Sequence, residues 1–225
     1  MSVPLLEARD LRVVRTGDAG PMKVLDGASL SLERGEVVDI SGPSGSGKTT
    51  FVRALALMLP DVAGELFLDG RPAAEVGSRA WRSRVALLPQ KPVIFPGTVR
   101  DNLLVPWRLK VRHGIAAPAE DAMRRTLDSF GLEDVALDRD AAKLSVGQAA
   151  RVAMARLGLT RPDVLLLDEP DASLDDDSAA LVAALTARFT ETGAVVRIRH
   201  HRPDGIATRR ERLVAGRLHG VGDSD

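Results

Sequence analysis

The residues with the clearest chemical role form a glycine-rich loop that ends in lysine and threonine. Residues 42–49 match the phosphate-binding pattern G-x-x-x-x-G-K-[ST] without a mismatch. Glycines let successive backbone N–H groups turn towards phosphate oxygens, and a helix N-terminus adds partial positive charge. The pattern predicts that Lys48 reaches the outer phosphates of a nucleotide and that the Thr49 hydroxyl holds Mg²⁺. The predicted nucleotide contacts are Gly42, Pro43, Ser44, Gly45, Ser46, Gly47, Lys48, Thr49 and Thr50.

The segments on either side of the loop fit this role. Residues 37–40 (Val-Val-Asp-Ile) predict a short strand that leads into the loop, and residues 50–59 predict the helix that leaves it. Strand, loop and helix in this order are the setting that a phosphate-binding loop requires. This context argues against the alternative of a Gly/Ser-rich turn with an accidental lysine.

A pair of acidic residues supplies the second half of a nucleotide site. Residues 164–167 are apolar throughout, as expected of a strand buried on both faces, and Asp168 and Glu169 follow at once. Asp168 is placed to bind Mg²⁺, directly or through water, and Glu169 to polarise a water that attacks the γ-phosphate. Gln90 ends another apolar run, so we expect it at the same edge of the sheet, in contact with Mg²⁺ or the attacking water.

Composition limits the classes of partner. Lys plus Arg and Asp plus Glu both number 31, which gives no general argument for nucleic acid or an anionic membrane surface. Cysteine is absent, so we expect neither disulfides nor thiolate metal sites. We also expect that the protein works in a reducing compartment. We see no signal peptide and no run of about 20 apolar residues. If the protein acts at a membrane, we therefore expect another chain to cross the bilayer.

The order of the predicted elements indicates one α/β domain over residues 1–225. Short apolar runs and turn signals in residues 5–40 predict a small β-rich lobe, and strand character returns at 65–68 and 84–88. Prolines and helical spacing from about 91 to 144 predict an inserted helical lobe. We assign 1–90 and 145–225 to the β lobe and the core. Within the second of these, we expect a helix at 178–190 and strands at 194–199 and 213–215.

Beyond these general motifs, the chain resembles one family. Residues 144–151, Leu-Ser-Val-Gly-Gln-Ala-Ala-Arg, resemble LSGGQ-x-x-R, the signature of ABC-type ATPases, and Ser145 also suits the N-cap of a helix. Gln90 resembles the Q-loop of that family, residues 172–175 with Asp175 resemble its D-loop, and His201 resembles its switch histidine. The resemblance implies a RecA-like phosphate-loop NTPase core with an antiparallel β lobe and an inserted helical lobe.

The resemblance also implies a working mechanism. Two copies would close head to tail around two molecules of Mg·ATP, so that Ser145, Gly147 and Gln148 of one copy meet the γ-phosphate held by Lys48 of the other. ATP hydrolysis, with Glu169 and His201 at the reaction centre, would let the pair reopen. The implied partner is a separate membrane-spanning permease, and the implied location is cytoplasmic, peripheral on the inner face of the membrane.

Three features depart from the family pattern. Val146 replaces the first glycine of the signature, so we expect weakened but not abolished closure. The chain contains no tyrosine, and the position of the aromatic that stacks on adenine aligns with Arg15, whose guanidinium plane can also stack on a base. Either His200 or His201 could be the switch residue, and counting from Ala194 favours His201.

The kind of transporter is indicated by residues 95–107. Residues 95–103 resemble the exporter form of the segment where a membrane subunit docks, and residues 104–107 are similar to ATP-binding subunits of bacterial iron exporters. We therefore expect an exporter with a metal such as iron as cargo. Two alternatives stay open: a soluble ABC ATPase that acts on nucleic acid or the ribosome, and a regulatory module with little hydrolysis.

Overall fold

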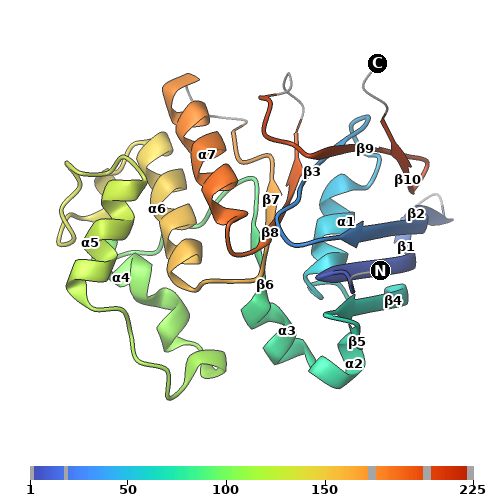
Figure 1. Cartoon of the computed structure of the whole chain (residues 1–225), viewed down its shortest axis with the longest axis horizontal. Helices are drawn as coiled ribbons and strands as arrows, with labels where there is room; N and C mark the ends of the chain where they lie inside the picture. The colour runs from blue at the N-terminus through green and yellow to red at the C-terminus, as the bar shows by residue number, and fades with distance from the viewer. Residues whose placement is uncertain (1–2, 18–19, 172–175, 200–203, 222–225) are drawn as a thin grey trace.

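Two sheets and a group of helices make up the protein, which we describe from a computed structural model (Figure 1). The structure describes residues 3–17, 20–171, 176–199 and 204–221. The order of strands in space is β2-β1-β4-β5 in the first sheet and β10-β9-β3-β8-β7-β6 in the second. Helices α4, α5 and α6 lie on the side away from the first sheet.

The first sheet is antiparallel and forms the β lobe. Its long hairpin consists of β1 (Leu6–Gly17) and β2 (Gly20–Leu32), and β4 (Ala63–Leu68) and the short β5 (Arg71–Pro72) add to the β1 edge. The predicted β-rich lobe ahead of the phosphate loop is confirmed. Residues 22–25 and 29–32, two of the short apolar runs within 5–40, belong to one strand that pairs with β1 through several bulges.

The second sheet carries the carboxyl edge at which the predicted site lies. Strands β3 (Val37–Ser41), β6 (Val85–Leu88), β7 (Val164–Asp168), β8 (Ala194–Ile198) and β9 (Arg209–Val214) run parallel, and only β10 (Arg217–Gly220) is antiparallel. Every residue of β7 and β8 is buried, as their near-continuous apolar sequence predicts.

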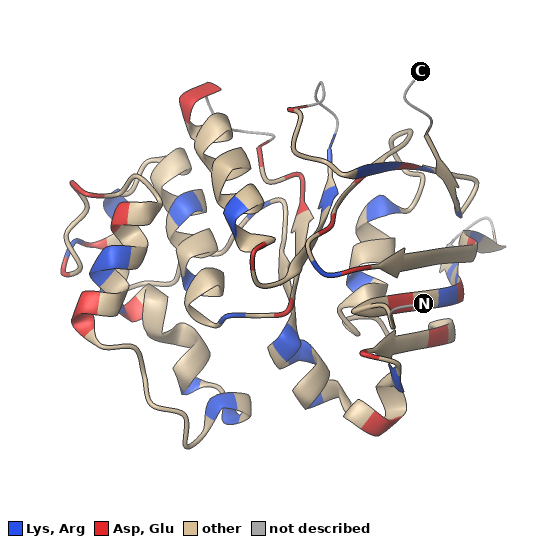
Figure 2. Ribbon diagram, viewed as in Figure 1, with Lys and Arg blue, Asp and Glu red and all other residues tan. Residues whose placement is uncertain are grey.

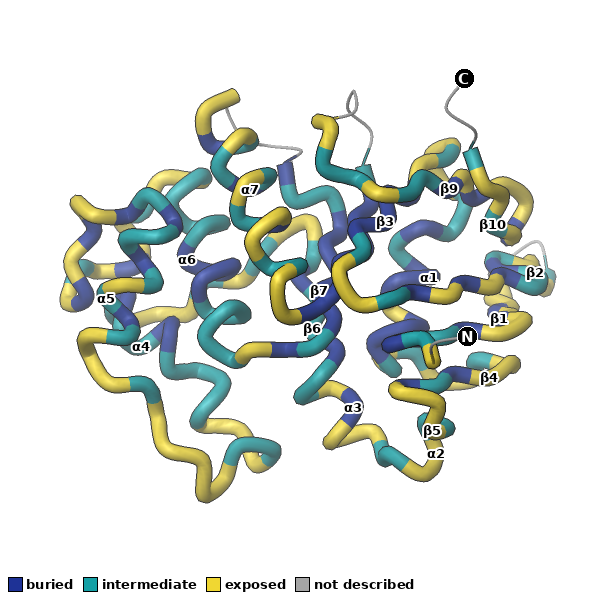
Figure 3. The backbone as a smooth tube through the Cα atoms, in the orientation of Figure 1, coloured by how far each residue is buried: buried dark blue, intermediate teal, exposed yellow. Residues whose placement is uncertain are grey.

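The helix after the phosphate loop, α1 (Lys48–Leu55), packs in the core between the two sheets, where Figure 3 shows buried backbone. It ends four residues earlier than predicted. Leu57 adopts a left-handed φ of 53°, and Pro60 follows, so the helix cannot continue. The short helices α2 (Ala73–Val76) and α3 (Ser78–Arg84) were not predicted. In α3, the fully buried Trp81 donates from Nε1 to the Leu55 carbonyl over 2.8 Å.

The segment between β6 and β7 is helical, and it extends beyond the predicted helical lobe of about 91–144 because α6 begins after it. It comprises α4 (Val99–Leu104), η1 (Val105–Arg108), η2 (Lys110–Arg112), α5 (Glu120–Ser129), η3 (Ala141–Lys143) and α6 (Val146–Leu159). Thr98 caps α4 by a reciprocal bond pair with Asp101, which accounts for the sharp start of that helix after Gly97. Helix α7 (Asp176–Phe189) follows β7, close to the predicted 178–190.

A pair of charged residues interrupts the apolar centre of the second sheet. Asp39 of β3 and Arg197 of β8 face each other in register, and the guanidinium donates to both carboxylate oxygens over 2.6 and 2.9 Å. Arg197 also binds Asp204, and its side chain is only 2% exposed. Elsewhere acidic and basic residues are both spread along the ribbon (Figure 2). This pair and the neighbouring pairs of Arg199 are mostly buried, unlike the many solvent-exposed ion pairs.

We predict that Arg197→Met lowers the free energy of unfolding by about 3 to 5 kcal/mol, because it leaves the Asp39 carboxylate buried without its main partner. Urea unfolding would measure this. The double variant Asp39→Val with Arg197→Met should recover most of the loss, since neither charge is then buried. Arg217→Met, which removes an exposed arginine 3.8 Å from Asp26, should change stability by less than about 0.5 kcal/mol.

Candidate nucleotide-binding site

The phosphate loop joins β3 to α1 through a turn that only glycine fits. Gly42, Gly45 and Gly47 all have positive φ, at 147°, 76° and 99°. A Cβ on Gly42 would lie 2.4 Å from the Leu213 carbonyl oxygen, and one on Gly47 would lie 2.8 Å from that of Val24. The neighbouring strands therefore leave no space for a side chain at Gly42 or Gly47, and the positive φ angles favour glycine there.

Lys48, the first residue of α1, is held against the loop itself. Its ammonium donates to the carbonyl oxygens of Gly42 and Pro43, each over 2.9 Å. Burial lowers its pKa, and the nearby carboxylates of Glu169 and Asp168 oppose that shift. A buried ammonium bonded only to neutral carbonyls is favourably placed to receive anionic phosphate oxygens.

The cleft beside the loop has the polar groups that a nucleotide needs. It measures about 370 Å³ and is lined by Ser44, Lys48, Thr49, Thr50 and Glu169, among others. The Ser46 hydroxyl in the same loop is buried without a hydrogen-bond partner in the described part of the chain, so an acceptor brought by a ligand would satisfy it. The residues present thus fit a bound polyphosphate.

Two of the three predicted metal ligands, Thr49 and Asp168, lie together. The Thr49 hydroxyl donates to the Asp168 carboxylate over 3.2 Å, although 119 residues separate the two in the chain. Burial raises the pKa of Asp168, and the hydrogen bond from Thr49 opposes the shift. A hydroxyl and a carboxylate are hard oxygen ligands, and Mg²⁺ at phosphate sites uses one or two protein ligands and keeps its waters. The pair fits Mg²⁺ on these grounds.

Gln90 contacts Glu169 and not the Thr49–Asp168 pair. Its side-chain amide donates to the Glu169 carboxylate over 2.6 Å. Glu169 itself has a left-handed φ of 51°, a conformation that non-glycine residues adopt rarely and often at functional sites. It lines the phosphate cleft and also a second cleft of about 330 Å³, which Gln90 and Val146 share. Glu169 therefore sits where the nucleotide cleft meets the helical segment.

The signature residues form the start of α6. Ser145 is the N-cap, and its hydroxyl accepts from the Gln148 backbone N–H while the Gln148 side chain accepts from the Ser145 backbone N–H. The predicted N-cap role of Ser145 is confirmed. Val146 is 69% exposed. Among the described residues that line the Lys48 cleft, none comes from 145–148, so the signature and the phosphate loop of one copy are separate.

The structure brings Arg15 to the nucleotide cleft. Arg15 pairs with Met22 across the β1–β2 hairpin, and both residues line the cleft with Val24 and Thr50. A guanidinium at the rim of a phosphate site can meet the base or the phosphates of a nucleotide. The alignment that predicted Arg15 at this position is therefore compatible with the geometry.

His201, His200 and Asp175 lie outside the described residues, but the residues beside them form an ionic cluster that we did not predict. Arg199 donates to Asp171 over 2.6 and 3.0 Å and pairs with Asp204 at 2.6 Å. Asp171 precedes the predicted D-loop, and Arg199 and Asp204 flank 200–203. The sequence did contain a sign of such a cluster, because Asp39 and Arg197 are charged residues within the otherwise apolar strands β3 and β8.

The chain also matches a known protein family. The fold and the paired clefts define a phosphate-loop nucleotide-binding domain. The family model described as ABC transporter matches residues 25–172. This chain belongs to the ABC transporter family and is an ATPase domain of it.

Three similar proteins illustrate the relationship. "ABC transporter I family member 17" from Arabidopsis thaliana is 39% identical over 77% of this chain and 64% of its own length. "Probable iron export ATP-binding protein FetA" from Escherichia coli K12 is 32% identical over 83% of this chain and 79% of its own. The structure titled "Structure of a bacterial Atm1-family ABC exporter with ATP bound" has a TM-score of 0.81 at 24% identity, covering 97% of this chain and 39% of that one.

The last comparison supports the fold alone, and it confirms the predicted ABC ATPase architecture. This chain spans only about two thirds of the length of the Arabidopsis relative. Among the described residues, no helix combines the length and the apolarity needed to cross a bilayer.

We predict that Gly47→Ala weakens ATP binding by at least about tenfold and destabilises the protein by roughly 1 to 3 kcal/mol, because the new Cβ meets the Val24 carbonyl at a strained φ. Fluorescent ATP-analogue titration and urea unfolding would measure the two effects. Gly220→Ala is the matched control, since a Cβ there meets nothing within 4 Å and its effect should stay within about 0.5 kcal/mol.

Proposed function

We propose that this protein is the ATP-hydrolysing subunit of a bacterial ABC transporter, working as a pair that drives a separate membrane-spanning partner. One observation carries the proposal: Lys48, Thr49 and Glu169 line the same cleft, and Thr49 bonds Asp168 at its base. Phosphate-binding, metal-binding and water-activating groups thus meet at one place. Such convergence suits cleavage of the terminal phosphate as well as nucleotide binding.

The residues divide the chemistry among them. Lys48 and the loop amides hold the phosphates, and Thr49 and Asp168 hold Mg²⁺. The bound ion would neutralise charge on the phosphate oxygens. Gln90 is hydrogen-bonded to Glu169, so it orients that carboxylate. Among the described residues nothing donates to its amide oxygen, which could accept from a water or contact the ion.

Glu169 would accept a proton from the attacking water. Its carboxylate lines the cleft that Lys48 also lines, which places it near the terminal phosphate of a bound nucleotide. We assign His201 to sensing of the γ-phosphate and Asp175 to contact with the second copy, on the family resemblance. Both lie outside the described residues.

The second copy would complete the site. Helix α6 has 14 residues, and its N-terminus carries Ser145, Gly147 and Gln148, where backbone N–H groups and the helix dipole favour an anion. Because this helix end does not line the cleft of its own chain, the γ-phosphate it would meet belongs to another copy. This separation supports the proposal that two copies pair head to tail when ATP binds.

Glu169→Gln should reduce ATP turnover at least about 100-fold while ATP binding is kept, because it removes the proton acceptor but not the phosphate contacts. Phosphate release in the presence of the membrane partner measures turnover. Size-exclusion chromatography with ATP should show an accumulated dimer.

The matched control is Glu191→Gln, which removes the same charge from an exposed position after α7. It should leave turnover within about twofold of the unmodified protein. Undiminished hydrolysis by Glu169→Gln would remove Glu169 from the proposed role.

Val146→Gly should strengthen ATP-dependent pairing, because glycine restores backbone freedom where the helix start meets the phosphate. In the Glu169→Gln background, sedimentation with ATP should show a dimer dissociation constant lower by at least about twofold. Val146→Ala separates backbone freedom from side-chain size as the cause. If backbone freedom is the cause, the dimer dissociation constant of Val146→Ala should stay close to that of the Val146 protein. If side-chain size is the cause, it should match that of Val146→Gly. Equal pairing in all three forms would contradict the assigned role of Val146.

We propose export, with a metal ion such as iron as cargo. The support is the exporter-like segment 95–107, which forms the start of the helical segment, together with the similarity to "Probable iron export ATP-binding protein FetA" of Escherichia coli. The cavity that selects the cargo would belong to the membrane partner. Purification of the complex and measurement of ATP-driven iron efflux from vesicles, with Glu169→Gln as the inactive control, would test this assignment.

A further inference from the structure

The connection from β8 to β9 is short for two parallel strands. It must pass over β3, which lies between those two strands, using only residues 199–208. The connection between two parallel strands usually has a dozen or more residues and contains an α-helix. In this crossover the described residues 204–208 form no helix. In the part of the chain that the structure describes, no helix residue lines this face of β3, β9 and β10, so we call it the open face.

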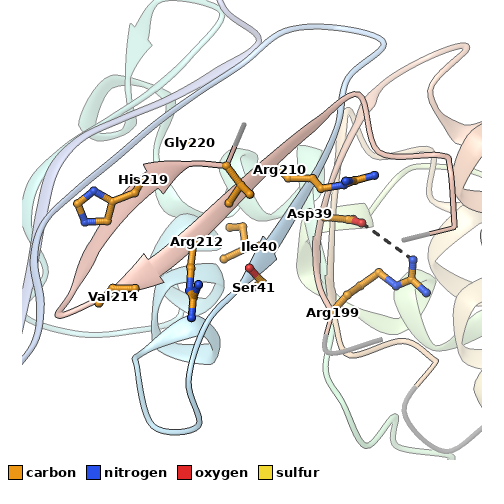
Figure 4. A pocket seen from close by; sticks show the side chains of 10 residues that line it. Asp39, Ile40, Ser41, Arg199, Arg210, Arg212, Val214, His219 and Gly220 are labelled. Atoms are coloured by element: carbon orange, nitrogen blue, oxygen red, sulfur yellow. Dashed lines mark ion pairs between the residues drawn. The ribbon is translucent and has the colours of Figure 1, made fainter. Parts of the chain in front are cut away.

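A cavity of about 690 Å³ occupies this open face (Figure 4). Three guanidiniums line it, from Arg199, Arg210 and Arg212, together with the imidazole of His219. Its volume lies within the range of small-molecule sites. None of the residues that line it lines the Lys48 cleft, so the two sites are distinct.

The charges of this cavity are not balanced. Arg209, on the same strand, pairs with Glu211 and Glu36. By contrast, within the described part of the chain neither Arg210 nor Arg212 has an ion pair or a side-chain hydrogen bond. Asp39 also lines the cavity, but both of its carboxylate oxygens already bind Arg197. Two guanidiniums are thus left with their donors available.

The placement of these donors suits phosphate. Arg210 and Arg212 are two residues apart on β9, so they leave the same face with Cα atoms about 7 Å apart, and Figure 4 shows their guanidiniums pointing in different directions within the cavity lining. His219 is the direct partner of Arg212 across the β9–β10 ladder. Guanidiniums present planar donor pairs that match phosphate oxygens, and imidazole adds a further donor.

We propose that this cavity binds the phosphate groups of a soluble small molecule, at a site separate from the ATP site. Its ligand would lie close to the ATP machinery. Ser41 lines the cavity and directly precedes Gly42 of the phosphate loop, and Arg199 binds Asp171, two residues after Glu169. A ligand bound in the cavity would therefore contact segments that flank the catalytic residues. We infer that such a ligand regulates ATP binding or hydrolysis.

The test uses inorganic pyrophosphate as the probe and isothermal titration calorimetry as the measurement. Every variant carries Lys48→Ala, which removes the ammonium of the phosphate loop and leaves the cavity as the main anion site. Arg210→Gln with Arg212→Gln should weaken pyrophosphate binding at least about tenfold, because both unpaired guanidiniums are lost. Arg217→Gln, which removes an exposed arginine of β10, should change binding by less than about twofold.

Two results would overturn the proposal. One is equal loss of pyrophosphate binding in the Arg217→Gln control and in the Arg210→Gln, Arg212→Gln variant, which would indicate nonspecific surface attraction. The other is binding to phosphatidic acid vesicles without any binding of free pyrophosphate, which would indicate a membrane surface. With Lys48 restored, the double variant should bind Mg·ATP within about twofold of the unmodified protein. That result separates this cavity from the ATP site and shows that the variant is folded.

Discussion

The parallel pairing of β3, β8 and β7 is the constraint on which the site depends. Parallel strands end at the same edge of a sheet, so the loop after β3 and the acidic residues after β7 meet there. The Thr49–Asp168 hydrogen bond is the result. The glycine turn adds a second constraint, because the carbonyls of Val24 and Leu213 leave no space for a Cβ outside the loop. Together they hold the nucleotide cleft open before any ligand arrives.

The same sheet also contains charge where most sheets are apolar. Asp39 and Arg197 compensate each other between two buried strands, and Asp204 and Arg199 extend the cluster to Asp171. Buried ion pairs contribute little net stability but are costly to break, so such a cluster strongly disfavours any other arrangement of the segments it joins. Those segments lead to the predicted D-loop and switch histidine. The cluster also neutralises Asp39 and so leaves the adjoining cavity cationic.

The signature segment shows how one set of residues can serve two purposes. Ser145 and Gln148 stabilise the start of α6 by a reciprocal capping box, which any helix could use. The same N-terminus does not line the Lys48 cleft of its own chain. In the proposed pairing it would meet the γ-phosphate held by a second copy, so that ATP binding favours association of two chains.

Much of this protein followed from the sequence alone. The phosphate loop, the buried strand that ends in Asp168 and Glu169, and the capped helix after Ser145 depend on residues near one another in the chain, so local pattern was enough. Short elements such as α2, α3 and β10 were missed because their few residues carry too little periodicity. The Gln90–Glu169 bond, the Asp39–Arg197 pair and the cavity around Arg210 and Arg212 were decided only by tertiary structure, because strand order and register bring together residues that the sequence separates.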